Sequence, residues 1–461
     1  FHGYDVSDPA TPKEIWSNTY QNNARLTSAR LLDGNLYVIT NTYITRTAPC
    51  PLEPLSANGT SVVIPCERIF HPVTPVATNS TFTVMKVNTA TGAVETNTSF
   101  VGTSSYKNTI YMSENAVYVT YSKSLDLANV FIDFFLTDGR GLISEATAKR
   151  IEKLRGYDIS ATAKFVEIEA IFEEVLSVND RDEQLRLETE FENSITKYAK
   201  RRLRELTATG IVKIEVPSLE ILHTGSVPGT PLNQFSLDEY NGFLRIATTL
   251  SGSGDLFFGS GESENDVYVL NDKLEITGSV QGLGLTERVY AARFIGDKGY
   301  IVTFRQIDPF YVLDLSNPSN PQMKGELKIP GFSSYLHPLS DNDILGIGRE
   351  GSSVKLTIFN VSDPENPTEK DTYLLSNSWS EIQSSHHAFL NDAKHNIFFL
   401  PASGNGFVFS YEDGTMKLVK SISGINATRA IFINDFFYII GSDSIVVLNE
   451  NDWSEVNRLD L

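Results

Sequence analysis

The amino-acid sequence predicts an all-β fold, a β-propeller built from four-stranded blades. Three observations support this prediction. Short segments with alternating apolar residues fill most of the chain, and four of them recur roughly every 40 to 50 residues, the period of propeller blades. In addition, one short phrase occurs three times. It is an apolar strand, then Ser-Asp or Ser-Asn, then Pro, with a second Pro three residues later.

The repeated phrase predicts the hairpin between the third and fourth strands of a blade. The Asp or Asn after Ser folds back on the backbone as an Asx-type turn, and the first Pro fixes φ at a turn position. The second Pro cannot donate to a ladder, so the next strand begins there and lies at the edge of the sheet. The first prolines are Pro9, Pro318 and Pro364, and the second are Pro12, Pro321 and Pro367.

Eight third strands are predicted along residues 1–461, which we take as a single β-propeller. They lie at residues 1–7, 81–88, 210–216, 266–271, 309–315, 354–361, 406–411 and 444–449. Seven blades are complete, whereas residues 1–20 hold only a third and a fourth strand and are predicted to be a half-blade. The two strands that this half-blade lacks either precede Phe1 in the full protein or come from another chain, including a copy of this one. An open strand edge is a template for such strand addition.

Two insertions are predicted between second and third strands, at residues 45–80 and 125–209. Both should therefore lie on one face of the propeller, together with the loop Ser251–Asn265 and the turn Phe304–Phe310. Elaborated loops on one side of a rigid scaffold are the usual place for binding.

The second insertion, in the third blade, is predicted to be helical because its apolar residues recur at helical spacing. Three helices are expected, at Ser144–Leu154, Ala161–Leu176 and Asp182–Leu206, with Asp180 or Asp182 capping the third. A basic cluster ends this helix: Lys197, Lys200, Arg201, Arg202 and Arg204. These cations either match the helix dipole or form a candidate docking site for an acidic partner, such as another copy of the chain.

Composition excludes several classes of function. The chain has 461 residues, of which 41% are hydrophobic, and a formal net charge of −19. Nucleic-acid binding needs a basic face, so we expect no nucleic-acid partner. No apolar run approaches the ~18 residues of a membrane span.

Cysteine and asparagine patterns predict an extracellular or cell-surface location. Cys50 and Cys66 are the only cysteines, and they lie in one polar loop. A closed pair indicates a disulfide formed in an oxidising compartment, the alternative being two free thiols. Five Asn-x-Ser/Thr sequons are candidate N-glycosylation sites: Asn58, Asn79, Asn97, Asn360 and Asn426. The same residues predict a glycoprotein.

Three segments resemble a known family. They are Glu239–Thr249 ("EYNGFLRIATT"), the long block Ala292–Pro338, and His386–Leu390 ("HHAFL"). They are similar to the secreted proteins with a C-terminal β-propeller domain found in archaea and some bacteria. The "DVSDP" phrase alone is similar to LVIVD-type surface repeats. The family resemblance implies an extracellular propeller, often on a chain with a targeting or anchoring segment, and it implies no catalytic residues.

The search for chemistry gives few candidates. No nucleophile elbow, P-loop, HExxH or CxxC is present. His386 and His387 are expected at the start of an inner strand, where neighbours point to opposite faces and cannot chelate one metal. His337 begins another inner strand and could face the channel. Asp341 and Asp343 are spaced like the first ligands of a calcium-binding loop, but the residues that follow do not supply the later ligands of such a loop. Charged side chains expected at the pore or its rim are Glu287, Arg288, Arg293 and Arg305.

Two functions therefore compete. The first is a non-enzymatic extracellular or cell-surface scaffold that binds protein or glycan, or that assembles into filaments or a surface layer. The second is an extracellular hydrolase or lyase that uses the central funnel. We expect no catalytic residues, no metal and no cofactor under the first hypothesis, which the sequence favours.

Overall fold

The protein is a β-propeller, as the sequence predicts, and its strands form eight sheets among the described residues. The computed structural model describes residues 1–8, 11–21, 23–45, 47–72, 78–103, 108–123, 125–177, 180–250, 262–305, 308–376 and 378–461. Pro9, most of the Ser251–Asn265 loop and part of the Phe304–Phe310 turn lie outside these residues. Contacts divide the chain into two compact units, one made of residues 1–234, 248–264 and 271–275, and the other of the remainder.

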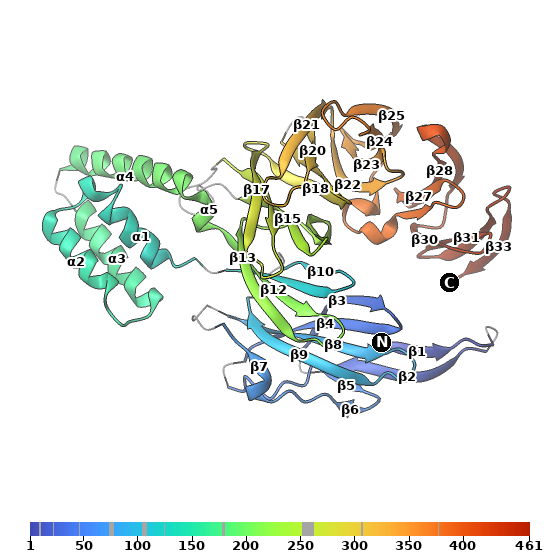
Figure 1. Cartoon of the computed structure of the whole chain (residues 1–461), viewed down its shortest axis with the longest axis horizontal. Coiled ribbons are helices and arrows are strands. Elements are labelled where there is room, and N and C mark those ends of the chain that lie inside the picture. The colour runs from blue at the N-terminus through green and yellow to red at the C-terminus, as the bar shows by residue number, and fades with distance from the viewer. Residues whose placement is uncertain are drawn as a thin grey trace. The chain divides into compact units, whose positions relative to one another are not determined.

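The first unit holds three sheets (Figure 1). The first sheet is β1 (His2–Asp5), β2 (Lys13–Tyr20), β5 (Leu55–Ala57) and β6 (Thr60–Ser61). The second is β3 (Arg25–Leu32), β4 (Asn35–Tyr43), β8 (Ser80–Asn88), β9 (Val94–Gly102) and β7 (Ile69–Phe70). The third is β10 (Ile110–Met112), β11 (Ala116–Ser122), β12 (Ala208–Glu215) and β13 (Ile221–Pro228).

The second unit carries five sheets, each a four-stranded antiparallel meander in chain order. They begin with β14 (Leu237–Tyr240), β15 (Phe243–Leu250), β16 (Glu264–Leu270) and β17 (Ile276–Leu283), followed by β18 (Arg288–Ile295), β19 (Lys298–Phe304), β20 (Asp308–Asp314) and β21 (Gln322–Ile329). Next come β22 (Phe332–Pro338), β23 (Asp343–Glu350), β24 (Ser353–Asn360) and β25 (Thr368–Leu375). The last two sheets are β26 (Leu390–Asp392), β27 (Ile397–Ala402), β28 (Asn405–Ser410) and β29 (Lys417–Ile422), then β30 (Ala427–Ile433), β31 (Phe436–Gly441), β32 (Ser444–Asn449) and β33 (Glu455–Asp460).

Hydrophobic cores lie between neighbouring sheets. Middle strands such as β24 are buried on both faces, because each of their faces packs on a different sheet. Phe310 of β20 stacks on Phe359 of β24, with ring centroids 4.2 Å apart. Outer strands such as β25 bury few residues, so apolar alternation weakens toward the outside of each sheet.

The repeated Ser-Asp/Asn-Pro phrase forms the predicted turn. Asn317 and Asp363 each accept a hydrogen bond from the backbone N–H two residues later, at 3.1 Å and 3.0 Å. β21 starts directly after Pro321, and β25 directly after Pro367. The turn therefore joins a third strand to an outermost strand, where a residue without an N–H donor is tolerated.

These turns also dock on the preceding sheet. A Cβ added to Gly278 of β17 would lie 2.5 Å from the Pro318 carbonyl oxygen of the following sheet. A Cβ at Gly325 of β21 would lie 2.7 Å from Cδ of Pro367. Both glycines sit in outer strands where the next turn approaches the backbone too closely for a side chain. We call this contact the turn–strand latch.

The same latch is built with other residues elsewhere. The Trp16 indole of β2 donates to the carbonyl of Thr89 at 2.7 Å, in the turn between β8 and β9. Lys420 of β29 donates to the carbonyl of Trp453 at 2.7 Å, in the turn between β32 and β33. Third-to-fourth turns thus bind a strand of the preceding sheet in both units.

One prediction about the first blade is wrong. β2 is not an outermost strand, because β5 of the 45–80 insertion pairs with it through Asn18, Thr19 and Tyr20. The insertion extends this sheet and is held by the disulfide between Cys50 and Cys66, whose Cα atoms lie 5.4 Å apart. A short insertion strand was not recognisable because Leu55–Ala57 is too short to show a period.

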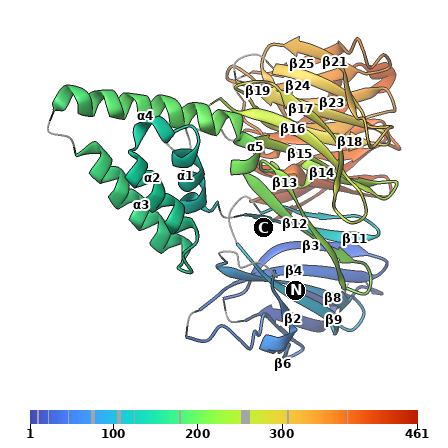
Figure 2. The ribbon, with the colours of Figure 1, turned by 60° about the vertical axis from the view of Figure 1, so that its left-hand side comes forward.

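The helical insertion lies between β11 and β12 and has one helix that the sequence did not predict. The helices are α1 (Leu127–Leu136), α2 (Glu145–Arg155), α3 (Ala161–Leu176), α4 (Arg181–Arg201) and α5 (Leu203–Leu206). α1 is a short, mostly apolar helix whose only polar residues are Asn129 and Asp133, and its buried face packs among the other helices (Figure 2). The third predicted helix is interrupted at Arg202, the C-cap of α4, although Asp180 caps its start as expected. Short 3₁₀ turns complete the described elements: Cys66–Arg68, Arg140–Leu142, Gln234–Ser236, Glu381–Gln383, His386–Ala388 and Glu412–Gly414.

The latch predicts that a methyl group on Gly325 destabilises the protein. Gly325→Ala should lower the free energy of unfolding by about 1–3 kcal/mol, because the backbone or the facing turn must move to fit the Cβ. Gly141→Ala is the control, since a Cβ there meets nothing within 4 Å. Thermal unfolding followed by circular dichroism measures both variants. Equal melting temperatures for the two would contradict the close approach.

Candidate functional site

The inner strands of the second unit bring together a group of rings and one guanidinium around His337. We call it the His337 cluster, and its members are Phe235, Arg293, Tyr335, His337, His386 and Phe389. Tyr335 and His337 are alternate residues of β22 and so share one face of the strand. Phe235, from the 3₁₀ turn before β14, lies 5.6 Å from the Tyr335 ring and 5.0 Å from the His386 ring.

His337 is held as a neutral imidazole. Its Nδ1 lies 3.2 Å from the Tyr335 hydroxyl oxygen, and its ring centre lies 4.7 Å from that of Phe389. Burial, and then the nearby charge of Arg293, lowers the pKa of His337 to about 4. Arg293 lies over the Phe235 ring at 4.6 Å, so a cation–π contact holds its charge within the cluster.

The hydrogen-bond partner of His337 is the hydroxyl of Tyr335. In many acid–base and nucleophilic sites a carboxylate, a hydroxyl or a thiol lies within hydrogen-bond reach of an imidazole. Among the described residues no carboxylate contacts the ring of His337. Its surroundings are aromatic and cationic, which suits packing around the inner strands.

The other rim residues predicted from sequence are dispersed. Glu287 accepts a hydrogen bond from the Thr303 hydroxyl at 2.5 Å, whereas Arg288 and Arg305 are exposed. Asp343 accepts hydrogen bonds from Lys370 at 2.9 Å and from the Asn360 amide at 3.3 Å. Asp341 is exposed. In the described part of the chain neither aspartate joins a group of three potential metal ligands.

The expected arrangement of His386 and His387 is wrong. They do not begin a strand but occupy a 3₁₀ turn, and β26 starts later, at Leu390. Successive residues of such a turn are rotated by about 120°, not by the 180° of a strand. Their rings therefore lie side by side, with centroids 4.0 Å apart.

Most of the basic cluster at the end of α4 is paired within the chain. Lys200 lies 2.5 Å from Glu262, and Arg204 lies 2.7 Å from Glu264. Arg201 pairs with Asp138, and Arg202 lies 3.5 Å from Glu205. Lys197 is exposed. Two of these pairs join the helical insertion to Glu262 and Glu264 at the start of β16, a strand of the sheet that follows β10–β13, so they orient the insertion.

The five sequons differ in exposure. Asn58, Asn79 and Asn426 are exposed, whereas Asn97 and Asn360 are half-buried. Asn58 and Asn426 have positive φ, a conformation that asparagine tolerates better than most residues, and their amides bond to Thr91 and Asp443.

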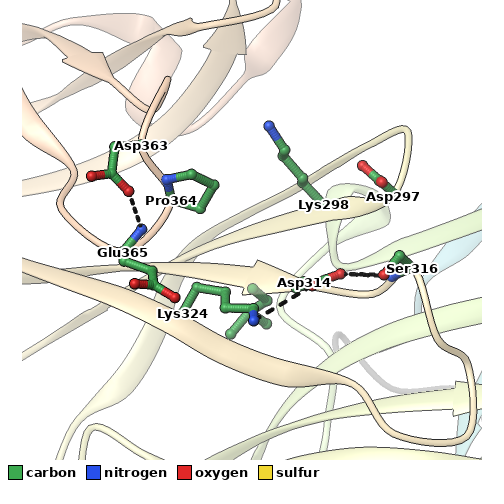
Figure 3. Close-up of a pocket in the computed structure, with 9 residues that line it drawn as sticks. Asp297, Lys298, Asp314, Ser316, Lys324, Asp363, Pro364 and Glu365 are labelled. Atoms are coloured by element: carbon green, nitrogen blue, oxygen red, sulfur yellow. Dashed lines mark hydrogen bonds and ion pairs between the residues drawn. The ribbon is translucent and has the colours of Figure 1, made fainter.

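A pocket of about 370 Å³ opens at a turn–strand latch (Figure 3). Its lining comes from the sheet β18–β21 and the turn after β24: Asp297, Lys298, Leu313, Asp314, Ser316, Lys324, Asp363, Pro364 and Glu365. Asp314 accepts hydrogen bonds from the Ser316 hydroxyl and N–H at 2.6 Å and 3.0 Å, which lower the pKa of its carboxyl. The acidic groups at this pocket therefore shape turns, and we assign no ligand to it.

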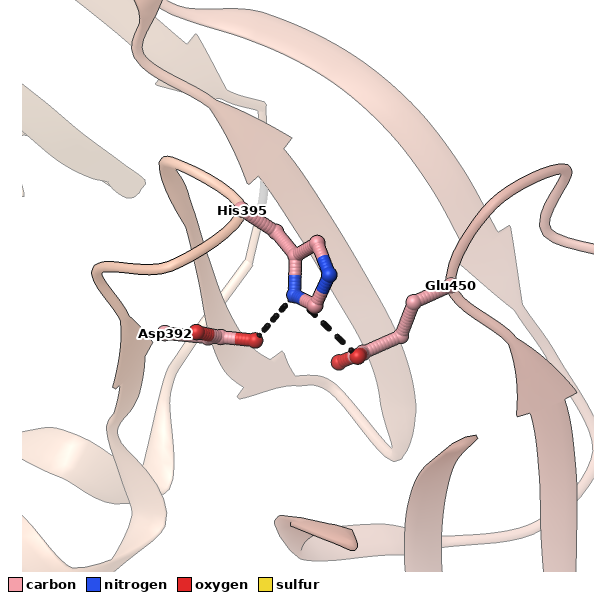
Figure 4. Close-up of side chains that lie close together, drawn as sticks. All are labelled: Asp392, His395 and Glu450. Carbon is pink, nitrogen blue, oxygen red and sulfur yellow. Dashed lines mark hydrogen bonds and ion pairs between the residues drawn. The ribbon is translucent and has the colours of Figure 1, made fainter. Parts of the chain in front are cut away.

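A second group of titratable residues was missed from the sequence. Asp392, His395 and Glu450 converge in the second unit (Figure 4). Asp392 and His395 are three residues apart in the turn between β26 and β27, a spacing that could have drawn attention to them. Glu450 follows β32, more than fifty residues later, and no sequence signal connects it to that turn.

Comparison with protein families supports the fold. The model of the beta propeller domain family matches residues 1–453. An uncharacterized protein of Archaeoglobus fulgidus is 49% identical over 451 residues, which cover 98% of this chain and 70% of that protein. An uncharacterized protein of Methanocaldococcus jannaschii is 36% identical over 464 residues, covering 99% of this chain and 72% of that protein. Among solved structures, BamB from Moraxella catarrhalis is similar over 54% of this chain and 70% of its own, with 14% identity and a TM-score of 0.37.

Acid should destabilise the protein through His337. In the unfolded chain the imidazole has its ordinary pKa of 6.5, whereas the folded pKa is about 4. Between these values the unfolded chain binds a proton that the folded chain does not, so stability present above pH 6.5 is lost as the pH falls toward 4. The loss is about 3 kcal/mol. Urea unfolding at stepped pH measures it, and His337→Gln should remove this part of the pH dependence. Parallel pH curves for the two proteins would refute it.

Proposed function

Because this chain belongs to the beta propeller domain family, we propose that it is an extracellular, non-enzymatic scaffold whose helical insertion binds another protein chain. The propeller fold suits a scaffold or interaction role in general, since its rigid sheets hold long loops in fixed places. Three parts of the proposal go beyond the fold: the extracellular location, the absence of catalysis, and the binding of another chain by the helical insertion.

The helical insertion carries the proposal. β11 and β12 already lie side by side at Ser122 and Thr209, so a two-residue turn would join them. A helical subdomain with its own core replaces that turn. Its core includes a tight contact between the rings of Phe172 and Phe191, whose centroids are 4.2 Å apart. The sheet gains nothing from such a structure, which supports a role in recognition.

The surface of the insertion has apolar side chains that binding could cover. Tyr157, Val166 and Leu185 have 56%, 58% and 63% of their surface exposed. Ion pairs between Arg150 and both Glu167 and Glu174 fix helices α2 and α3 against each other. The insertion is therefore a rigid surface, which lowers the entropic cost of binding.

An extracellular location is supported by the disulfide and the sequons. The bond between Cys50 and Cys66 suits an oxidising compartment. Three of the five sequon asparagines are exposed on folded protein. None of the helices in the described residues is long and apolar enough to cross a membrane.

Copies of the chain are one candidate partner. β1 lies at one edge of its sheet, and no strand pairs with its other side among the described residues. A free strand edge can accept a strand from a second copy. The competing proposal is a hydrolase or lyase in the funnel; the described contacts of His337 are with rings, the charge of Arg293 and the Tyr335 hydroxyl, with no carboxylate among them.

Cross-linking of native cells tests the proposal. Lysine-reactive cross-linkers should join Lys149, Lys153 and Lys197 of the insertion to one recurrent partner chain, and a variant with residues 125–207 replaced by a Gly-rich turn should lose that partner. Unchanged melting of the shortened chain would show that its propeller is intact. Cross-links confined to the insertion itself, or turnover of a glycan by the purified protein, would sink the proposal.

Glycosylation should follow the exposure of the sequons. Asn79 is exposed, whereas Asn360 is half-buried, donates its amide to Asp343, and accepts the hydroxyl of its own sequon Ser362 at 2.6 Å. We expect glycan on Asn79 and little or none on Asn360. Glycopeptide mass spectrometry of protein from the native organism measures both occupancies. Surface-fraction protein without glycan at any of the five sequons would contradict an extracellular glycoprotein.

A further inference from the structure

One imidazole nitrogen faces two carboxylates at the contact between the last two sheets. Nδ1 of His395 lies 2.6 Å from a carboxylate oxygen of Asp392 and 3.2 Å from one of Glu450 (Figure 4). The other oxygen of Asp392 accepts the backbone N–H of Lys394 at 2.9 Å, which fixes the turn between β26 and β27. Three side chains from two different sheets therefore meet at one point.

These carboxylates are inside the protein. The side chains of Asp392 and Glu450 have 2% and 0% of their surface exposed, and that of His395 has 21%. Among the described residues no group donates a well-aligned hydrogen bond to Glu450, whose nearest polar partner is Nδ1 of His395 at 3.2 Å. A buried carboxylate with so few donors is rare because burial strongly disfavours a poorly paired charge.

Charges within the chain do not balance this group. Nδ1 can carry a single proton, and that proton faces both Asp392 and Glu450. The nearest cation along the chain, Lys394, is exposed and pairs with Asp435 at 2.8 Å. A single N–H group of His395 therefore serves two buried carboxylates.

We propose that Asp392, His395 and Glu450 bind one divalent transition-metal ion, with Zn²⁺ as its best representative. An imidazole nitrogen with carboxylate oxygens is a ligand set that Zn²⁺ accepts and that Ca²⁺ and Mg²⁺ disfavour. The three ligand atoms lie within 4.8 Å of one another. Ligands bonded at about 2.1 Å to a tetrahedral ion are about 3.4 Å apart, so the 3.2 Å separation fits and the 2.6 Å one must open slightly.

The ion would tie two sheets together. Asp392 and His395 belong to the sheet β26–β29, and Glu450 belongs to the sheet β30–β33. The same two sheets share a core that includes Phe399, Val408 and Ile439. β33 is exposed along its whole length, so the last sheet depends on its contact with the sheet before it. A metal ion at this contact would stabilise the packing of the two sheets. This structural role goes beyond the proposed scaffold function.

Metal analysis of the full-length protein tests this site. After removal of metal with a chelator, the protein is equilibrated with Zn²⁺, passed through a desalting column and measured by mass spectrometry for metal. Wild type should retain about one Zn²⁺ per chain more than Glu450→Gln. Asp435→Asn, which changes an exposed carboxylate beside the site, should retain as much as wild type.

Thermal unfolding separates a metal from a shared proton. With Zn²⁺ the wild type should melt several degrees higher than without it, whereas Glu450→Gln should not respond to Zn²⁺. Without metal, Glu450→Gln should melt at or above wild type, because it removes one of two buried like charges; this also shows that the variant folds. Equal zinc in wild type and Glu450→Gln overturns the proposal. The proposal is also overturned if the melting temperature of the wild type does not change with Zn²⁺ and falls as the pH rises. That result would show a proton held between the carboxylates.

Discussion

Turns between a third and a fourth strand dock on a strand of the sheet before them, and the rest of the propeller depends on this contact. Sheets that pack face to face through apolar side chains can slide, because hydrophobic contact has no preferred direction. The turn–strand latch, in contrast, fixes where a particular turn lies on a particular strand. A proline carbonyl lies against the bare backbone of Gly278, and a proline ring lies against that of Gly325. Backbone contacts of this kind leave little freedom in the angle between successive sheets.

The latch also explains why glycine stands in exposed outer strands. Glycine weakens a strand because it has no side chain to pack and more entropy to lose. Here its lack of a Cβ is what lets the next turn approach. Where the strand carries a side chain instead, as at Trp16 and Lys420, that side chain donates a hydrogen bond to a carbonyl of the turn. Different residues thus meet the same requirement. A turn packs against the neighbouring sheet while its carbonyl groups keep hydrogen-bond partners.

A scaffold fixed in this way tolerates long insertions. The 45–80 and 125–209 segments both leave and re-enter the sheets at adjacent strand ends, so neither disturbs the pairing of β4 with β8 or of β11 with β12. Lengthening a loop costs little conformational entropy once its ends are held together. The insertion helices then need only their own core and two ion pairs, through Lys200 and Arg204, to be oriented.

The sequence by itself determined the strands, the repeat and the turn, because alternation and proline act over a few residues. It predicted the span of α3 and seven third strands as the structure has them, whereas β1, the eighth, lies at the edge of its sheet. It identified His337 as an inner-strand residue, but it did not identify α1, a short helix with only two polar residues, nor the 3₁₀ turn that places His386 beside His387. Tertiary structure alone decided that the basic residues of α4 have carboxylate partners and that Glu450 meets Asp392 and His395. The physical reason is distance along the chain: local patterns set local conformation, whereas a charge finds its partner only when distant sheets pack together.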